Sequence, residues 1–134
     1  MKIDKLKLLK LILRLGALYF TIGAIAHYFG LTLFPWYDAS LYAPYQDTLL
    51  ALSTIISALF LFVIAHDPIK NIDTLNVVII GAALASIVSI AVIWKINFAA
   101  LGAPDKKLQT IVEGIIGFVY VGFLIWLYTR KVKM

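Results

Sequence analysis

The sequence predicts an all-α integral membrane protein, an antiparallel four-helix bundle with both termini cytoplasmic. Three observations support this fold class. The 134-residue chain is 63% apolar and 14% charged, with a mean hydropathy of +0.97, whereas a soluble domain is about 45–50% apolar and about 25% charged. It contains four apolar runs long enough to cross a bilayer, which takes about 20 residues each. Its Lys and Arg residues gather mainly outside these runs.

The four predicted spans follow one another with short breaks, and residues 1–134 form a single transmembrane domain. Short loops make neighbouring helices antiparallel. The first run has a basic start and the triplet Ala24-Ile25-Ala26, as in a cleaved signal peptide, but we interpret it as a retained span. Proline, glycine and aspartate mark the breaks, near residues 35–44, 67–68 and 102–105. The spans cover about residues 11–34, 47–66, 74–95 and 108–129.

The distribution of Lys and Arg sets the expected orientation, because cytoplasmic loops carry an excess of these residues. The two tails and the second loop together hold nine, against three in the third loop and none in the first. We therefore expect both termini in the cytoplasm and the protein in the cell membrane. These basic clusters fit contacts with anionic lipid heads. No basic face with interleaved aromatics lies outside the spans, which argues against nucleic acid as a partner.

Several chemistries lack the residues they need. Cysteine is absent, which excludes disulfides, thiolate metal sites and thiol nucleophiles. The two histidines, His27 and His66, fall at opposite ends of their spans, too far apart to ligate one haem or one zinc. We expect no metal and no cofactor. Because no phosphate loop or nucleophile elbow occurs either, catalysis is the least supported class of function.

The first loop is rich in aromatic residues. Residues 35–45 contain four aromatics and no Lys or Arg. Amphipathic rings favour the headgroup level of a bilayer. One interpretation is an aromatic belt on the outer interface, and the other is a lid over an opening between the helices.

Small residues recur at helical spacing within the spans. Gly16, Gly23 and Gly30 are seven residues apart and fall on one face of a helix. Small residues let helices in lipid approach closely, so we interpret these positions as helix–helix contacts. The other spans carry comparable stripes, namely Asp47, Ala51, Thr54, Ala58 and Ala65, then Gly81, Ala85 and Ser89, then Glu113, Gly117, Tyr120 and Leu124.

Polar groups from all four predicted helices gather toward the outer leaflet. A charge in the hydrocarbon region costs at least about 2.5–3.5 kcal/mol, so such residues usually face the bundle interior. We expect Glu113 to point inward and to pair with His27 or Lys95. The group could lock the helices together, line a pocket for a small ligand or lipid head, or carry proton chemistry between a carboxyl and an imidazole. The candidate ligand-binding residues are His27, Tyr19, Asp47, Trp94, Lys95 and Glu113.

The start of the first span carries a recognisable pattern, RLGALYFTIGAIAH at residues 14–27. It resembles the first helix of small four-span bacterial membrane proteins of the DoxX-like and BphX-like kind. In those families an Arg and a Gly open the helix, and a small-residue face leads to a polar group near its outer end. The resemblance implies a four-span architecture and, because several of these proteins are thought to accompany others, association with further membrane proteins.

Three classes of function remain. The leading expectation is a non-catalytic subunit or accessory partner of a larger membrane assembly, because the chain is small, has no soluble domain and carries glycine stripes. One alternative is a dimeric small-molecule transporter that uses Glu113. The other is a small membrane enzyme or binding protein for a lipid or quinone, with a polar pocket at His27, Asp47 and Glu113. The expected partners are membrane lipids and either further copies of the chain or other membrane subunits.

Overall fold

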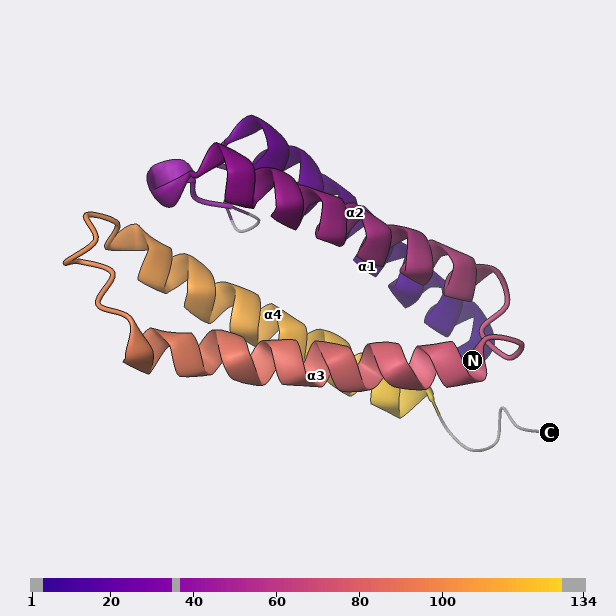
Figure 1. The fold of residues 1–134 in the computed structure, drawn as a ribbon. Coiled ribbons are helices and arrows are strands. Elements are labelled where there is room, and N and C mark those ends of the chain that lie inside the picture. Colours follow the sequence, from indigo (N-terminus) through magenta and orange to yellow (C-terminus); the bar gives the residue numbers. More distant parts are fainter. Residues whose placement is uncertain (1–3, 35–36, 129–134) are drawn as a thin grey trace.

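The computed structural model describes residues 4–34 and 37–128, and its architecture is helical (Figure 1). Each of the four long helices is long and apolar enough to cross a membrane. The predicted all-α four-helix bundle is therefore confirmed, and the chain is a small multi-pass membrane protein. The cytoplasmic location of both termini stays a prediction from the Lys and Arg distribution. The helices are α1 (Lys5–Phe29), α2 (Pro44–His66), α3 (Ile72–Lys95) and α4 (Asp105–Leu127), with a 3-10 turn η1 (Ala39–Leu41) between α1 and α2.

Helix α1 differs from its predicted span at both ends, because hydrogen bonding rather than hydropathy decides where a helix begins. The Asp4 carboxylate accepts hydrogen bonds from the backbone N–H groups of Leu6 and Lys7, at 3.1 and 3.2 Å, as an N-cap does. At the other end Gly30 adopts a left-handed conformation with φ of 60°, which glycine tolerates best. Gly30 is therefore a C-cap, and its interpretation as a helix–helix contact was wrong.

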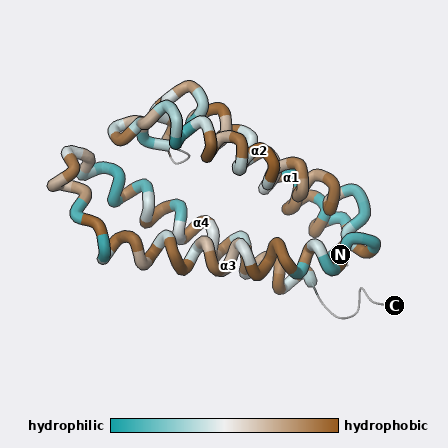
Figure 2. The backbone as a smooth tube through the Cα atoms, viewed as in Figure 1, coloured by the Kyte–Doolittle hydropathy of each residue, from teal (hydrophilic) through white to brown (hydrophobic). Residues whose placement is uncertain are grey.

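The helices form two hairpins, α1–α2 and α3–α4 (Figure 1). Within each hairpin the helices pack closely, whereas α2 and α3 barely touch. The hairpins meet at the end that holds the first turns of α1 and the last turns of α4, here called the closed end. They separate toward the end that holds residues 30–34, 37–43 and 96–104, here called the open end. Apolar residues dominate the helices, and hydrophilic ones gather near the ends of the helices and in their loops (Figure 2).

The core of the molecule lies at the closed end, where all four helices contribute side chains. Lys5 also places its ammonium group 5.5 Å from the centre of the Trp126 ring, which joins α1 to α4. Dispersion contacts between the apolar core side chains hold helices together in lipid, because the bilayer supplies little hydrophobic drive between them. The closed-end core consists of Leu9, Leu13, Ala17, Leu61, Ile64, Ala65, Leu75, Leu124 and Leu127.

The glycines of the spans make different kinds of contact. Gly16 faces the hydroxyl of Tyr120 on α4, and a Cβ on Gly23 would lie 3.8 Å from the methyl group of Thr54 on α2. Gly117 lies directly against Ser86 on α3. Gly81, by contrast, meets no atom of the described residues within 4 Å of an added Cβ, so its interpretation as a contact within the bundle was wrong. Close glycine packing therefore joins α1 to α4 and α3 to α4.

Candidate ligand-binding site between the two hairpins

Two adjoining cavities lie between the hairpins. The larger, with a volume of about 460 Å³, is lined mainly by apolar and small residues of α1, α3 and α4; we call it the apolar cavity. The smaller, about 310 Å³, lies at the open end between α1, α2, α4 and the first loop; we call it the polar pocket. His27 and Glu113 line both, so these two residues mark the junction of the cavities.

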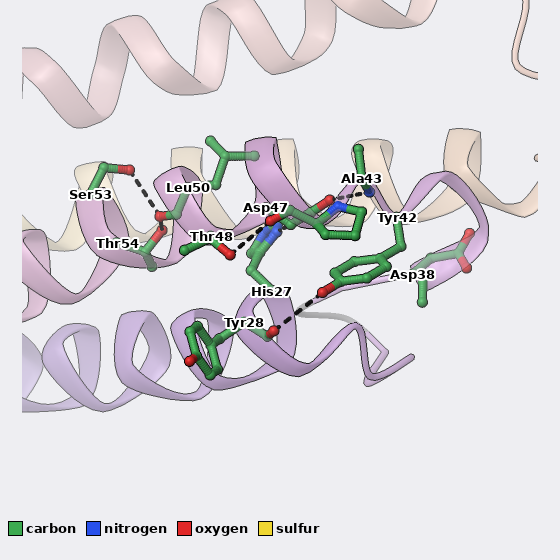
Figure 3. A network of polar contacts seen from close by, with 12 residues as sticks. His27, Tyr28, Asp38, Tyr42, Ala43, Asp47, Thr48, Leu50, Ser53 and Thr54 are labelled. Atoms are coloured by element: carbon green, nitrogen blue, oxygen red, sulfur yellow. Dashed lines mark hydrogen bonds and ion pairs between the residues drawn. The ribbon is translucent and has the colours of Figure 1, made fainter.

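The central polar pair of the site joins α1 to α2 (Figure 3). His27 Nδ1 lies 2.7 Å from Asp47 Oδ1. The other carboxylate oxygen, Oδ2, accepts a hydrogen bond of 2.7 Å from the backbone N–H of Ala43, just before α2 begins. The Asp47 side chain is thus buried, with 5% of the residue exposed, and both its oxygens are bound. Asp47 fixes the His27 ring and at the same time binds the backbone N–H of Ala43, the N-cap residue of α2, much as the acidic residue of a capping box does.

Tyr37 covers this pair because the chain after α1 folds back on itself. The backbone of Leu33 and Tyr37 exchanges two hydrogen bonds, of 2.7 and 2.9 Å. The Tyr37 ring consequently lies 4.2 Å from the His27 ring, with 3% of the residue exposed. Burial, and then a hydrogen bond to Asp47, raise the pKa of the Tyr37 phenol.

The aromatic residues of the first loop thus occupy different environments. Tyr45 is 78% exposed, which suits the belt interpretation, whereas the buried Tyr37 suits the lid interpretation. Trp36 lies outside the described residues.

Lys106, in the first turn of α4, connects the second hairpin to the loop of the first. Its ammonium group donates a hydrogen bond of 3.1 Å to the backbone carbonyl of Asp38 and lies 4.5 Å from the centre of the Tyr37 ring. A cation over an aromatic face is attracted by the ring quadrupole. This link bounds the polar pocket at the open end, as the closed-end core bounds the apolar cavity at the other.

Glu113 points between the hairpins and is held from its own helix. Gln109 Nε2 donates a hydrogen bond of 2.9 Å to Glu113 Oε1. Glu113 also interacts electrostatically with Tyr19 of α1 and with Lys106. Gln109 is 2% exposed, and its Oε1 atom has no hydrogen-bond partner among the described residues. A buried acceptor without a donor costs roughly 1–3 kcal/mol. The site therefore contains one unsatisfied acceptor atom, Gln109 Oε1.

The predicted site residues separate into two groups. His27, Tyr19, Asp47 and Glu113 come together around the cavities, and Trp94 and Lys95 line neither of them. The reason is helical geometry, since Trp94 lies about 140° around α3 from the cavity-lining Ser89 at 100° per residue. Trp94 is accordingly 83% exposed. The expected pairing of Glu113 with Lys95 was therefore wrong, and Lys106 is the cation near Glu113. Glu113 accepts a hydrogen bond from Gln109, and His27 pairs with Asp47 instead.

Four polar residues of the polar pocket were not among the predicted candidates, namely Tyr37, Gln46, Lys106 and Gln109. Lys106 and Gln109 were assigned to a loop and a helix start, because the predicted span began at residue 108. The signal was present in the spacing, since Lys106, Gln109 and Glu113 lie three and four residues apart and so share one helix face. For Tyr37 no such signal exists, because its position depends on how the loop folds back.

The site has hydrogen-bonding groups but no evident place for a metal. Within residues 4–34 and 37–128, no group of three His, Asp or Glu side chains is arranged to hold an ion. The arrangement can instead accept and donate hydrogen bonds at one end while enclosing an apolar chain at the other.

The loop at the open end should lose stability in acid. Burial alone would raise the pKa of Asp38, but hydrogen bonds from the backbone and hydroxyl of Ser40 and the charge of Lys106 bring it below its usual value. A lowered pKa means that the folded state binds fewer protons, so the stabilisation is present above the unfolded value of about 3.9 and is lost as the pH falls below it. Asp38→Asn keeps a side-chain acceptor but removes the negative charge that strengthens the Ser40 hydrogen bonds and attracts Lys106. It should therefore cost up to about 1 kcal/mol at pH 7. Melting the parent and the variant at pH 7 and pH 3 should show this difference shrinking, and a constant difference would contradict the assignment.

Comparisons of this chain with protein-family models, with curated proteins and with solved structures find no match.

Proposed function

We propose that this membrane protein binds a lipid-like amphipathic molecule between its two helical hairpins. The observation that carries the proposal is that the apolar cavity and the polar pocket share two lining residues, His27 and Glu113. Ligand sites usually measure about 300–1,000 Å³ and are apolar with a few placed polar groups. The apolar cavity, at about 460 Å³, has this size and composition, and the polar pocket supplies the polar groups at one end.

The distribution of lining residues favours a ligand that lies along the helices. On α4 the lining runs from Glu113 to Tyr120, about 10 Å along the helix axis at 1.5 Å per residue. Polar residues mark the open end of this path and small or aliphatic ones the middle, which fits an acyl or isoprenoid chain with a polar head. Lateral entry from the bilayer is favoured because α2 and α3 barely touch and α2 supplies Thr54 to the lining.

Filling the apolar cavity tests this proposal. Gly23→Leu places a side chain in the cavity from α1, where an added Cβ makes only ordinary contact, and Ala85→Phe does so from α3. The parent protein, extracted in mild detergent, should retain close to one lipid-like molecule per chain by native mass spectrometry. Both variants should lose most of it while keeping their helical circular dichroism. Gly81→Leu is the matched control, because Gly81 faces open space, and it should keep the ligand.

The proposal fails if the parent carries no such molecule. It also fails if Gly23→Leu and Ala85→Phe, both folded, retain as much as the parent.

A second candidate function, an accessory subunit of a larger membrane assembly, is favoured by α3. Within the described chain this helix buries only Leu75 and Ser86, and it leaves Gly81 open. Small residues on an uncovered face suit close packing against another membrane helix, and the DoxX-like resemblance of residues 14–27 points to the same role. Gly81→Leu separates the two functions, because it should displace a co-purifying subunit and leave the bound lipid in place.

A further inference from the structure

The groups at the junction of the two cavities are mainly hydrogen-bond acceptors. Glu113 as a carboxylate only accepts, and it already receives one hydrogen bond from Gln109. The Oε1 atom of Gln109, which is buried, has no donor among the described residues. Of the other side-chain donors that line the polar pocket nearby, Lys106 is engaged with the Asp38 carbonyl and the Tyr37 ring, and Gln46 lies on the exposed side of the pocket.

The Asp47 carboxylate determines which nitrogen of His27 carries the proton. Because a carboxylate cannot donate, the 2.7 Å contact requires a proton on Nδ1. In the neutral ring Nε2 is then an acceptor. The hydrogen bond that His27 makes among the described residues uses Nδ1, and His27 lines both cavities, so Nε2 is the nitrogen left for a ligand.

We propose that the head of the bound molecule is uncharged and carries hydroxyl groups, which donate hydrogen bonds to His27 Nε2 and to the Glu113 carboxylate. This inference rests on the proposed binding function and names the class of ligand: a monoacylglycerol or a comparable hydroxylated amphiphile. An anionic head fits poorly, because the polar pocket holds two carboxyl groups, Asp47 and Glu113, against one ammonium group, Lys106. That ammonium group already binds the Asp38 carbonyl and lies over the Tyr37 ring. A head without donors would leave the buried acceptors unpaired.

Asp47 acts in this recognition as a positioning residue. Replacing it with asparagine should abolish or reverse the preference for a head that donates hydrogen bonds over one that does not. In Asp47→Asn, the backbone N–H of Ala43, which now faces Oδ2 at 2.7 Å, requires the amide oxygen on that side. The amide NH₂ must then face His27 Nδ1 and donate to it. The proton of the neutral ring moves to Nε2, which becomes a donor toward the cavity.

Three probes with the same 14-carbon chain test the inference by titration of the lipid-depleted protein in detergent. They are 1-monomyristoylglycerol, the same molecule with both hydroxyls methylated, and the corresponding lysophosphatidic acid. The parent should bind the first at least about tenfold more tightly than the other two, as expected for unpaired buried acceptors. In Asp47→Asn the preference for the hydroxylated probe over its methylated form should fall to about one or reverse. Lys95→Gln, an exposed residue outside both cavities, should keep it.

The outcomes distinguish failure of the hydroxylated head from failure of the proposed lipid-binding function. If no probe binds the parent, the proposed function fails. If all three bind equally, or lysophosphatidic acid binds best, the binding function stands and the hydroxylated head is wrong. His27→Phe, which keeps a ring against Tyr37, provides a second variant in case Asp47→Asn does not fold, and it should also lose the preference. An unchanged preference in either folded variant would overturn the role of His27 Nε2.

Discussion

Replacing Leu13 with alanine should lower the thermal stability of the purified protein severely, by about 2–5 kcal/mol in unfolding free energy. Leu13 has no exposed surface and lies in the closed-end core with residues of all four helices. Truncation would remove its dispersion contacts and leave a void that the surrounding helices fill only in part. The closed end is the place where the hairpins are held together by apolar packing, so their association should weaken with it.

Leu11→Ala is the matched control for this prediction. Leu11 lies on the same helix, two residues away, but is 51% exposed. In lipid or detergent its side chain exchanges one apolar environment for another, so truncation should change stability little. Thermal melts followed by circular dichroism in one detergent compare the two variants directly. Equal losses would show that the closed-end core does not hold the hairpins together.

A methyl group added at Gly117 should be the second most damaging change. The new Cβ would collide with the hydroxyl oxygen of Ser86 on α3 and lie 3.3 Å from the Ser86 Cβ. Ser86 is buried, with 4% exposed, and its hydroxyl is bonded to the Ala82 carbonyl at 2.9 Å, so it has little room to move. Overpacking of this kind costs about 1–3 kcal/mol, and Gly117→Ala should lower the melting temperature accordingly.

Two further variants make the Gly117 prediction specific. Gly81→Ala adds the same methyl group where nothing lies within 4 Å, and it should be neutral or stabilising by up to about 1 kcal/mol through helix propensity. Ser86→Ala removes the colliding oxygen, so the double variant Ser86→Ala with Gly117→Ala should recover part of the loss. A double-mutant cycle measures this coupling. Purely additive effects would place the cost of Gly117→Ala somewhere other than the α3–α4 contact.

The sequence was sufficient for the number of helices, because length and hydropathy alone decide whether a segment can cross a bilayer. Helix ends were less predictable, as α1 illustrates. Its basic first residues were assigned to a tail, but the Asp4 carboxylate caps the helix there. The unequal spacing of the helices was also beyond prediction. Small-residue stripes indicate that a face can pack closely but not which helix covers it, and Gly81 is covered by none of the described residues.

Part of the candidate site could be predicted from the depth of each residue in the bilayer and the helix face on which it lies. His27, Asp47 and Glu113 lie at similar depth in an antiparallel bundle, and all three contribute to the site. Depth alone misplaced Trp94 and Lys95, since they lie at the right level on the wrong side of α3. The contact of Lys106 with Tyr37 joins residues 69 positions apart through a folded loop, and no periodic pattern in the sequence encodes such a contact.

The two hairpins pack together at the closed end and lie apart at the open end, so a small rotation about the closed-end core moves the open end much further. Each helix is about 35 Å long at 1.5 Å per residue. For a rigid helix of about this length, a rotation of roughly 5° at the closed-end core displaces the far end by roughly 3 Å. That displacement is as long as the 3.1 Å hydrogen bond between Lys106 and the Asp38 carbonyl. A rotation of this size at the closed-end core would therefore be enough to break the contact between the two loops at the opposite end of the protein.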